Sequence, residues 1–236
     1  MNATSSTRRA GGDQRIPRPT VWSAGTASPW AAQRDRALTR LSLDAVLGAV
    51  PPVDADRTRT PAFEDSRPSA VLIALYDGPQ GAEVVLTKRS TRLSSHRGEI
   101  SFPGGRMDAG ESPVQTALRE AHEEVGLDPG VVTVCGELGH LNTLVSRSYI
   151  VPVVARLASR PDLRPSPAEV DRVLFVPLTE LVRADTHREE RWGTPPDDFS
   201  IHFFELDDET VWGATGRMLY QLLCLAFLLP AAATIW

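Results

Sequence analysis

Two apolar runs separated by a short polar segment form the clearest pattern in the chain. Residues 70–76 and 83–87 are apolar and partly β-branched, and residues 77–81 between them include two glycines and a proline. Apolar runs of this length on either side of a glycine-containing turn are typical of a β-hairpin. The pattern therefore predicts two antiparallel strands here.

Strand-like and helix-like segments alternate over the rest of the chain. Further strands are expected at 131–135, 148–155 and 170–176, with a weaker candidate at 202–206, and helices at 113–125, 177–184 and 213–229. Strand pairs mixed with helices favour a mixed sheet that is covered on both faces. We therefore predict an α/β fold, an α/β/α sandwich around a mixed β-sheet.

The segments before this domain have a different character. Residues 1–37 are rich in Ser, Thr, Gly, Pro and Arg without periodicity, which predicts a flexible basic tail; an RNA-binding arm is the less favoured alternative. Apolar residues then recur at helical spacing from Leu38 to Ala49 and are followed by two prolines. We predict a short helix and linker over 38–67 and one domain over 68–236.

Composition and charge exclude several classes of protein. The chain is 42% hydrophobic and 23% charged, as in globular proteins. Its net charge of -5 offers no overall basic field, so we expect no nucleic-acid partner. Two widely separated cysteines, Cys135 and Cys224, favour reduced thiols and a cytoplasmic location. We expect no export signal, since residues 10–18 after a twin arginine are polar.

The apolar end of the chain has two explanations. Residues 222–236 are fewer than the roughly 20 that span a bilayer, and Pro230 interrupts them, so no membrane segment is expected. A helix that packs in the core and a helix that packs in a homodimer interface would both show this pattern.

The helix at 113–125 has the most complete local signals. Ser112 fits the N-cap, Pro113 the first helical position and Gln115 the third position of a capping box. Gly126 supplies the stop. One narrow apolar stripe is made by Val114, Ala117, Leu118, Ala121 and Val125.

Three glutamates lie on an arc beside this stripe: Glu120, Glu123 and Glu124. Like charges at this spacing destabilise a helix by about 0.2–0.5 kcal/mol per pair. A solvated acidic face is the ordinary explanation for such a cluster. However, a Pro-Gly-Gly loop at 103–105 directly precedes the helix, and clustered carboxylates beside such a loop suit Mg²⁺ or Mn²⁺, which prefer oxygen ligands.

These residues resemble a known family motif. Gly105, five residues, Glu111, seven residues and then Arg119 to Leu127 match the Nudix box, GX5EX7REUXEEXGU with U apolar, at every defined position. The resemblance implies a Nudix fold and divalent-metal-dependent hydrolysis of a nucleoside diphosphate linked to another group. It agrees with the α/β/α prediction.

The resemblance also implies roles for individual residues. The implied metal ligands are the backbone carbonyl of Gly105 and the carboxylates of Glu120, Glu123 and Glu124. Arg119 would orient the glutamates by pairing with Glu111. For the general base, Glu123 is the first candidate and Glu169 the second, although an ordinary surface glutamate is the simpler interpretation of Glu169.

The segment just upstream resembles the coenzyme A pyrophosphatase motif, LLTXRSX3RX3GX3FPGG. The matching residues are Thr87, Arg89, Ser90, Gly98, Phe102, Pro103, Gly104 and Gly105. Ser94 departs from the motif, which has arginine there, and Arg92 and Arg97 lie near enough to replace it. The segment therefore indicates a coenzyme A site with one altered contact.

Coenzyme A carries a 3′-phosphate besides its diphosphate, and arginines bind phosphate through charge-assisted hydrogen bonds. The expected substrate-binding residues are Arg89, Ser90, Arg92, His96 and Arg97. The products would be 3′,5′-ADP and 4′-phosphopantetheine, or its acyl derivative. Two alternatives remain: a Nudix hydrolase of ADP-ribose, NADH or damaged nucleotides, and a non-catalytic nucleotide-binding regulator, which has no need of three metal carboxylates.

Overall fold

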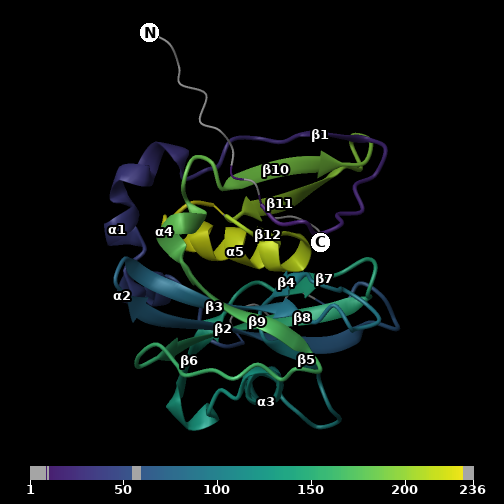
Figure 1. Ribbon diagram of the computed structural model, residues 1–236. Helices are drawn as coiled ribbons and strands as arrows, with labels where there is room; N and C mark the ends of the chain where they lie inside the picture. Colours follow the sequence, from purple (N-terminus) through teal and green to yellow (C-terminus); the bar gives the residue numbers. More distant parts are fainter. Residues whose placement is uncertain (1–8, 10, 55–59, 231–236) are drawn as a thin grey trace.

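A computed structural model describes residues 9, 11–54 and 60–230 of the chain. The elements stack in layers: a small sheet, a helix, a large sheet and a second helix (Figure 1). The predicted sandwich is confirmed by the lower three layers, and the small sheet is an addition that the sequence did not predict.

The large mixed sheet forms the centre of the molecule. Its strands are β2 (Arg67–Gly78), β3 (Gly81–Arg89), β4 (Ile100–Ser101), β5 (Gly104–Arg106), β6 (Val132–Glu137), β7 (Leu141–Asn142), β8 (Ser148–Leu157) and β9 (Val170–Pro177). The order is β4-β3-β2-β8-β6, with β9 paired to β3, β5 to β2 and β7 to β8. Strands β2 and β8 run parallel, and β2 and β3 form the predicted antiparallel hairpin.

One helix covers each face of this sheet. Helix α3 (Pro113–Val125) lies on one face and has the predicted start, because the Ser112 side chain accepts from the Gln115 backbone and the Gln115 side chain accepts from the Ser112 backbone. Helix α5 (Gly213–Ala226) lies on the other face, between the two sheets (Figure 1).

The apolar residues of α5 are buried within the chain itself, among them Leu219, Leu222 and Leu223. Burial in the core thus accounts for the apolar pattern. The apolar pattern therefore gives no support for a homodimer, which stays a prediction. No helix within the described ranges is long and apolar enough to cross a membrane.

The small sheet lies on the far side of α5. Its strands are β1 (Trp22–Ala24), β10 (His187–Trp192), β11 (Phe199–Glu205) and β12 (Thr210–Val211), in that order. Only part of β11 was predicted. Strand β10 reads HREERW, so it shows no apolar alternation, and its charged residues are stabilised by ion pairs such as Arg188 with Glu205 at 2.9 Å.

The prediction of a flexible tail is wrong for residues 11–37. Strand β1 pairs with β10 along Trp22 to Ala24, and the Arg18 guanidinium pairs with the buried Glu190 carboxylate. Trp30 is fully buried, with its ring 4.9 Å from that of His187. The segment is not a solvated chain, because its glycines allow close contacts and its Arg18 forms an ion pair. Residues 1–8 and 10 lie outside the described residues.

The helix predicted near residue 38 is broken into short pieces. These are η1 (Ala31–Arg36), α1 (Ala37–Arg40) and α2 (Leu43–Gly48). The break occurs at Leu41, whose carbonyl accepts a hydrogen bond from Ala82 of β3 at 2.8 Å. Leu38 is 70% exposed and does not belong to the core. Two further short helices are η2 (Pro129–Val131) and α4 (Leu178–Leu181), the latter shorter than the predicted 177–184.

Candidate active site

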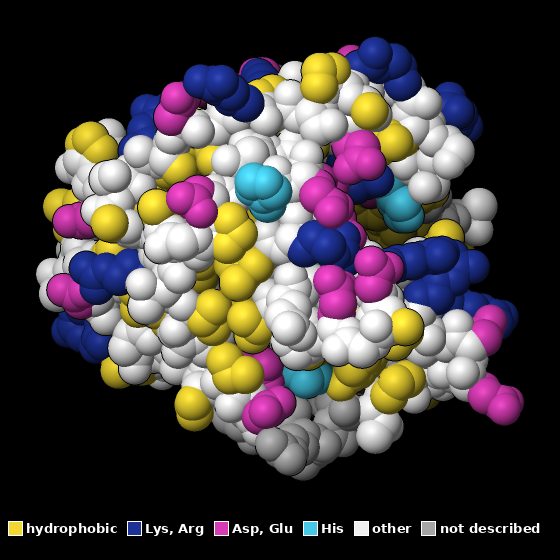
Figure 2. Space-filling model, turned by 90° about the horizontal axis from the view of Figure 1, so that it is seen from below, with side chains coloured by type: hydrophobic (Ala, Val, Ile, Leu, Met, Phe, Trp, Pro, Cys, Tyr) yellow, Lys and Arg dark blue, Asp and Glu magenta, His cyan; other side chains and the backbone are white. Residues whose placement is uncertain are grey.

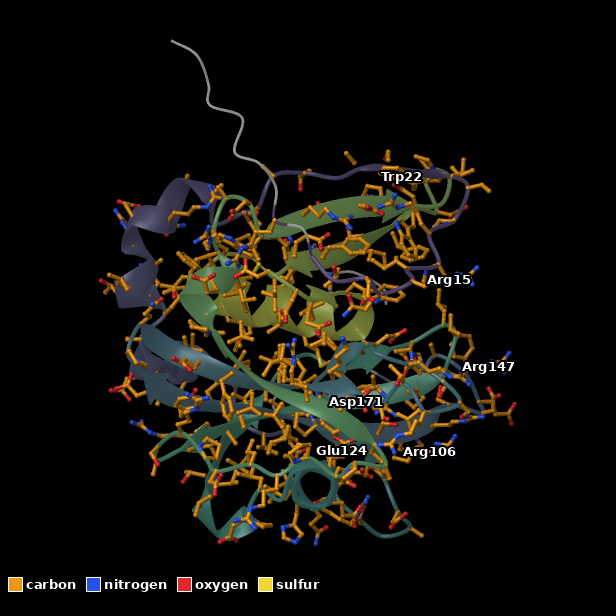
Figure 3. All side chains as sticks on the ribbon, viewed as in Figure 1. Arg15, Trp22, Arg106, Glu124, Arg147 and Asp171 are labelled. Carbon is orange, nitrogen blue, oxygen red and sulfur yellow. The ribbon has the colours of Figure 1, made fainter. Side chains whose placement is uncertain are left out.

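The predicted metal and substrate residues meet at one end of the large sheet. The end of β3, the short strand β5 and helix α3 lie together there, because β5 pairs with the start of β2 and α3 packs against both strands. In Figure 3, Glu124 lies between α3 and the sheet, and Asp171 lies nearby at the start of β9. Figure 2 shows acidic and basic side chains gathered on the face that carries α3.

Arg119 organises the acidic cluster. Its guanidinium binds Glu111 with two hydrogen bonds of 2.8 and 3.0 Å, Glu120 at 2.9 Å and Glu123 at 3.1 Å. A further bond of 3.0 Å reaches the carbonyl of Arg106 in β5. The orienting arrangement that the sequence indicated, with Arg119 paired to Glu111, is therefore present.

Glu111 is held as an anion by this network. It also accepts from the Thr116 hydroxyl at 2.7 Å and from the Asp108 backbone at 3.0 Å. Hydrogen bonding from Arg119, followed by these two bonds, lowers the pKa of Glu111 to about 2. The same pairing holds the pKa of Arg119 above its usual range. Glu111 thus fixes the guanidinium that in turn orients Glu120 and Glu123.

Glu124 has a different environment from the other glutamates. It is 3% exposed, and one of its oxygens accepts from the Gly104 backbone at 3.3 Å. The other oxygen lies 3.7 Å from the Arg89 guanidinium. Burial raises the pKa of Glu124 to about 7, although Arg89 and the Gly104 bond oppose the shift. Such a group favours a nearby positive charge that would keep it ionised.

Gly105 allows a carboxylate to approach the backbone closely. A Cβ on Gly105 would lie 2.4 Å from the carboxyl carbon of Glu120, so the glutamate occupies the space that a side chain would fill. Burial raises the pKa of Glu120, and its hydrogen bond with Arg119 opposes that shift. The backbone of the Pro-Gly-Gly loop and two partly desolvated carboxylates therefore lie together.

This donor set fits a hard divalent cation by its chemistry: carboxylate oxygens, a carbonyl without a covering side chain, and a buried acid with a raised pKa. Within the described part of the chain, no three His, Cys, Asp or Glu side chains are gathered closely enough to hold a metal ion. Arg119 holds Glu120 and Glu123, while the Glu124 carboxylate is directed toward Gly104 and Arg89.

Glu169 lies beside this cluster, immediately before β9. Its backbone carbonyl accepts from Ser90 at 2.8 Å, and its side chain is exposed. Its negative charge contributes to the raised pKa values of both Glu120 and Glu124. Glu169 thus lies close enough to act on two of the three glutamates, and its role as a base stays a prediction.

The five predicted substrate residues have different surroundings. Arg89 faces Glu124, whereas Ser90 is buried. Arg92 contacts Ser90 and the Pro167 carbonyl, and Arg97 contacts the Leu93 carbonyl. His96 pairs with Glu99 at 2.9 Å, which raises the pKa of the imidazole. Arg89 is therefore the predicted substrate residue in direct contact with the glutamates.

The sequence analysis did not identify Asp171, which anchors the segment after β3, at Ser90 and Thr91, to the start of β9. Its carboxylate accepts from the Thr91 backbone at 3.0 Å, and that bond and one from Ser90 lower its pKa. No motif marks Asp171. An acidic residue two positions after Glu169 offered only a weak signal, because its partners lie 80 positions earlier in the chain.

Comparison with known proteins agrees with this geometry. Residues 66–199 match the NUDIX domain model, which is more than half of the chain. The chain belongs to the Nudix family. The match begins beside β2 and ends at the start of β11, so it contains the glutamate cluster and leaves out the N-terminal segment, most of β11 and α5.

Individual relatives are similar over about two thirds of the chain. It is 36% identical to Nudix hydrolase 22, chloroplastic, of Arabidopsis thaliana over 174 residues, 70% of this chain and 57% of the relative. It is 35% identical to the peroxisomal coenzyme A diphosphatase ndx-8 of Caenorhabditis elegans over 156 residues, 64% of each chain. This Nudix chain thus spans less than two thirds of these relatives' length.

Among solved structures, a Nudix hydrolase from M. smegmatis, RenU, is 26% identical to this chain. It covers 50% of this chain and 75% of its own, with a TM-score of 0.44.

Proposed function

We propose that this Nudix protein hydrolyses the diphosphate of coenzyme A or its thioesters, with Mg²⁺ or Mn²⁺, to 3′,5′-ADP and 4′-phosphopantetheine or its acyl derivative. The observation that carries the proposal is the position of Arg89. This residue of the coenzyme A motif points at Glu124 of the Nudix box, at 3.7 Å. The substrate motif and the catalytic motif therefore meet at one point.

The metal would be held by the Glu120, Glu123 and Glu124 carboxylates and the Gly105 carbonyl. A divalent cation bound there neutralises charge on the diphosphate and lowers the pKa of a bound water. Arg119 orients Glu120 and Glu123 from the opposite side. Phosphoryl transfer depends mainly on such positioning and on charge stabilisation.

The general base accepts a proton from the attacking water. Glu123 fits this role because its side chain is 53% exposed, so water reaches it, and one of its oxygens accepts from Arg119 at 3.1 Å. Glu169, exposed on the other side of the cluster, is the second candidate.

Substrate selection would come from the loop between β3 and β4. Arg89 supplies a cation beside the glutamates. Together with Arg92, His96 and Arg97 it would bind the additional 3′-phosphate through charge-assisted hydrogen bonds. The relative named as a coenzyme A diphosphatase, at 35% identity, supports this assignment.

Product analysis tests the proposal. The purified protein is incubated separately with coenzyme A, ADP-ribose and NADH, with and without Mg²⁺ or Mn²⁺, and the products are resolved by mass. We expect metal-dependent 3′,5′-ADP and 4′-phosphopantetheine from coenzyme A. If only ADP-ribose or NADH is cleaved, Nudix chemistry stands and the coenzyme A assignment fails. If nothing is cleaved, the regulator alternative gains support.

A further inference from the structure

A short N-terminal strap lies against the turn between β11 and β12. The strap is defined as residues 11–14, outside the segment that matches the Nudix model. The backbone nitrogen of Gly11 donates to the Leu206 carbonyl at 3.1 Å, and that of Gly12 donates to the Thr210 hydroxyl at 3.0 Å. Gly11 has φ +67°, and a Cβ there would lie 2.1 Å from a carboxylate oxygen of Glu205. The strap therefore fits closely against the small sheet.

The side chain of Gln14 joins this strap to the loop between β3 and β4, residues 90–99, which we call the substrate loop. Its carboxamide oxygen accepts from the Thr210 backbone at 3.1 Å, and its nitrogen donates to the Glu209 carboxylate. The same nitrogen donates to the carbonyl of Gly98 at 3.3 Å. Gly98 belongs to the coenzyme A motif, so Gln14 bridges the small sheet and the loop at 90–99.

Gly98 is connected in turn to Arg89. The Gly98 nitrogen donates to the Arg89 carbonyl at 3.1 Å, and the Arg89 nitrogen donates to the Glu99 carbonyl at 2.9 Å. These bonds close the base of the loop. Gln14 contacts the backbone of Gly98, which is hydrogen-bonded to the backbone of Arg89. The Arg89 guanidinium in turn lies 3.7 Å from Glu124.

Glu209 gives Gln14 a fixed partner. Its carboxylate is buried, at 2% exposure, and pairs with Lys88 at 2.8 Å and with Arg172 at 2.7 Å. A buried carboxylate that is paired on two sides keeps its position, because leaving it unpaired would be costly. Lys88 directly precedes Arg89 on β3, so the same carboxylate fixes both Gln14 and the strand end.

We infer that Gln14 is a positioning residue, which holds the loop at 90–99 and through it the backbone of Arg89 in the geometry that binds the substrate. The inference rests on the proposed function, since it assigns this loop to substrate binding. It adds a specificity element from a segment that lies outside the family match. Gln14 acts on binding and not on the chemical step, because it contacts none of the glutamates of the Nudix box.

The test uses two substitutions in the full chain. Gln14→Met keeps the length of the side chain and removes its hydrogen bonds. Gln14→Glu keeps the acceptor for Thr210 but places a second carboxylate beside Glu209. Arg18→Ala is the matched control, because Arg18 binds Glu190 and the Trp22 ring in the same N-terminal segment and is not in contact with the loop at 90–99.

Of the three hydrogen bonds that Gln14→Met removes, one neutral bond reaches the loop, at Gly98. We expect KM for coenzyme A to rise about fivefold, the usual consequence of losing one such bond, with kcat within about twofold. Gln14→Glu should raise KM more. Hydrogen exchange of the peptide at 89–99 should become faster in both variants, because the loop loses its anchor. Arg18→Ala should leave KM and the exchange of this peptide unchanged.

Wild-type KM and unchanged exchange in both Gln14 variants would overturn the inference. A fall in kcat with constant KM, or equally fast exchange in Arg18→Ala, would also overturn it. Failure of the proposed function is distinguishable: if the wild-type protein cleaves none of the diphosphates, hydrogen exchange still decides whether Gln14 holds the loop.

Discussion

Helix α3 and the small sheet show two ways in which this chain determines structure. Helix α3 has its own start in Ser112 and Gln115 and its own stop at Gly126, so neighbouring residues fix it. Strand β10 has no such local signals. Its buried Glu190 accepts from Arg18, 172 positions earlier in the chain, as well as from Arg188 and Trp192. The proposed metal ligands therefore lie on a locally determined element, while the surrounding support depends on contacts between distant segments.

The largest expected effect concerns the support region. Trp30→Ala removes a fully buried ring that packs against His187, Phe204 and Tyr220. We expect the free energy of unfolding to fall by about 3–5 kcal/mol. Urea denaturation monitored by circular dichroism measures it. A loss below 1 kcal/mol would mean that the N-terminal segment is a tail after all, and that the contrast with α3 is misplaced.

The next effect concerns the locally determined element. Glu124→Gln should lower kcat more than about 100-fold. Loss of a residue that only hydrogen-bonds to a metal ligand typically lowers activity about 10–100-fold, and loss of a ligand itself should lower it further. The variant should still fold, because the glutamine oxygen can accept from the Gly104 backbone as the glutamate does. Steady-state kinetics and a thermal melt separate the two. A folded variant with wild-type kcat would refute the ligand assignment.

Arg89→Ala tests the contact between the end of β3 and helix α3, because it removes the guanidinium that faces Glu124. A charged hydrogen bond contributes about 1.5–3 kcal/mol, so KM for coenzyme A should rise roughly tenfold or more. KM for dephospho-coenzyme A should rise less. Arg156→Ala, which breaks a surface ion pair with Asp44, is the control and should change neither. Equal increases for the two substrates would mean that Arg89 does not bind the 3′-phosphate.

The smallest effect is a pH dependence in the support region. Burial lowers the pKa of His202 to about 3, and its ring stacks on Tyr220 at 3.7 Å. The unfolded chain, with a pKa near 6.5, takes up a proton that the folded chain excludes. The free energy of unfolding should therefore fall as the pH drops below about 6.5, by up to about 1.4 kcal/mol per unit.

His202→Phe provides the comparison for this pH dependence. It keeps a buried aromatic ring and removes the titrating group, so its denaturation midpoints should depend less on pH between about 5 and 6.5. Identical slopes for the two proteins in urea denaturation would show that His202 titrates normally.

The sequence predicted the large sheet and the grouping of the glutamates on one helix, for a physical reason. Strands β2 and β3 are continuous apolar runs around a glycine turn, and the cluster on α3 is spaced by the helix itself. The pairing of Arg119 with Glu111, which the family resemblance implied, joins two residues of one motif.

The missed features depend on contacts between distant segments. Strand β10 is charged along its length, and its charged residues pair with Arg18 of the N-terminal segment and with Glu205 of β11. Asp171 and Gln14 bind backbone groups of the substrate loop 80 or more positions away. The break at Leu41 depends on a bond with β3. Periodicity within a window of ten to eighteen residues contains none of this information.

The most direct test of the central claim compares the wild-type protein with Glu124→Gln. Both are incubated with coenzyme A and Mn²⁺ at enzyme concentrations above that of the substrate, and the products are identified by mass. The account predicts 3′,5′-ADP and 4′-phosphopantetheine from the wild-type protein and almost none from the folded variant. Intact coenzyme A in both reactions, or equal product from both, would contradict it.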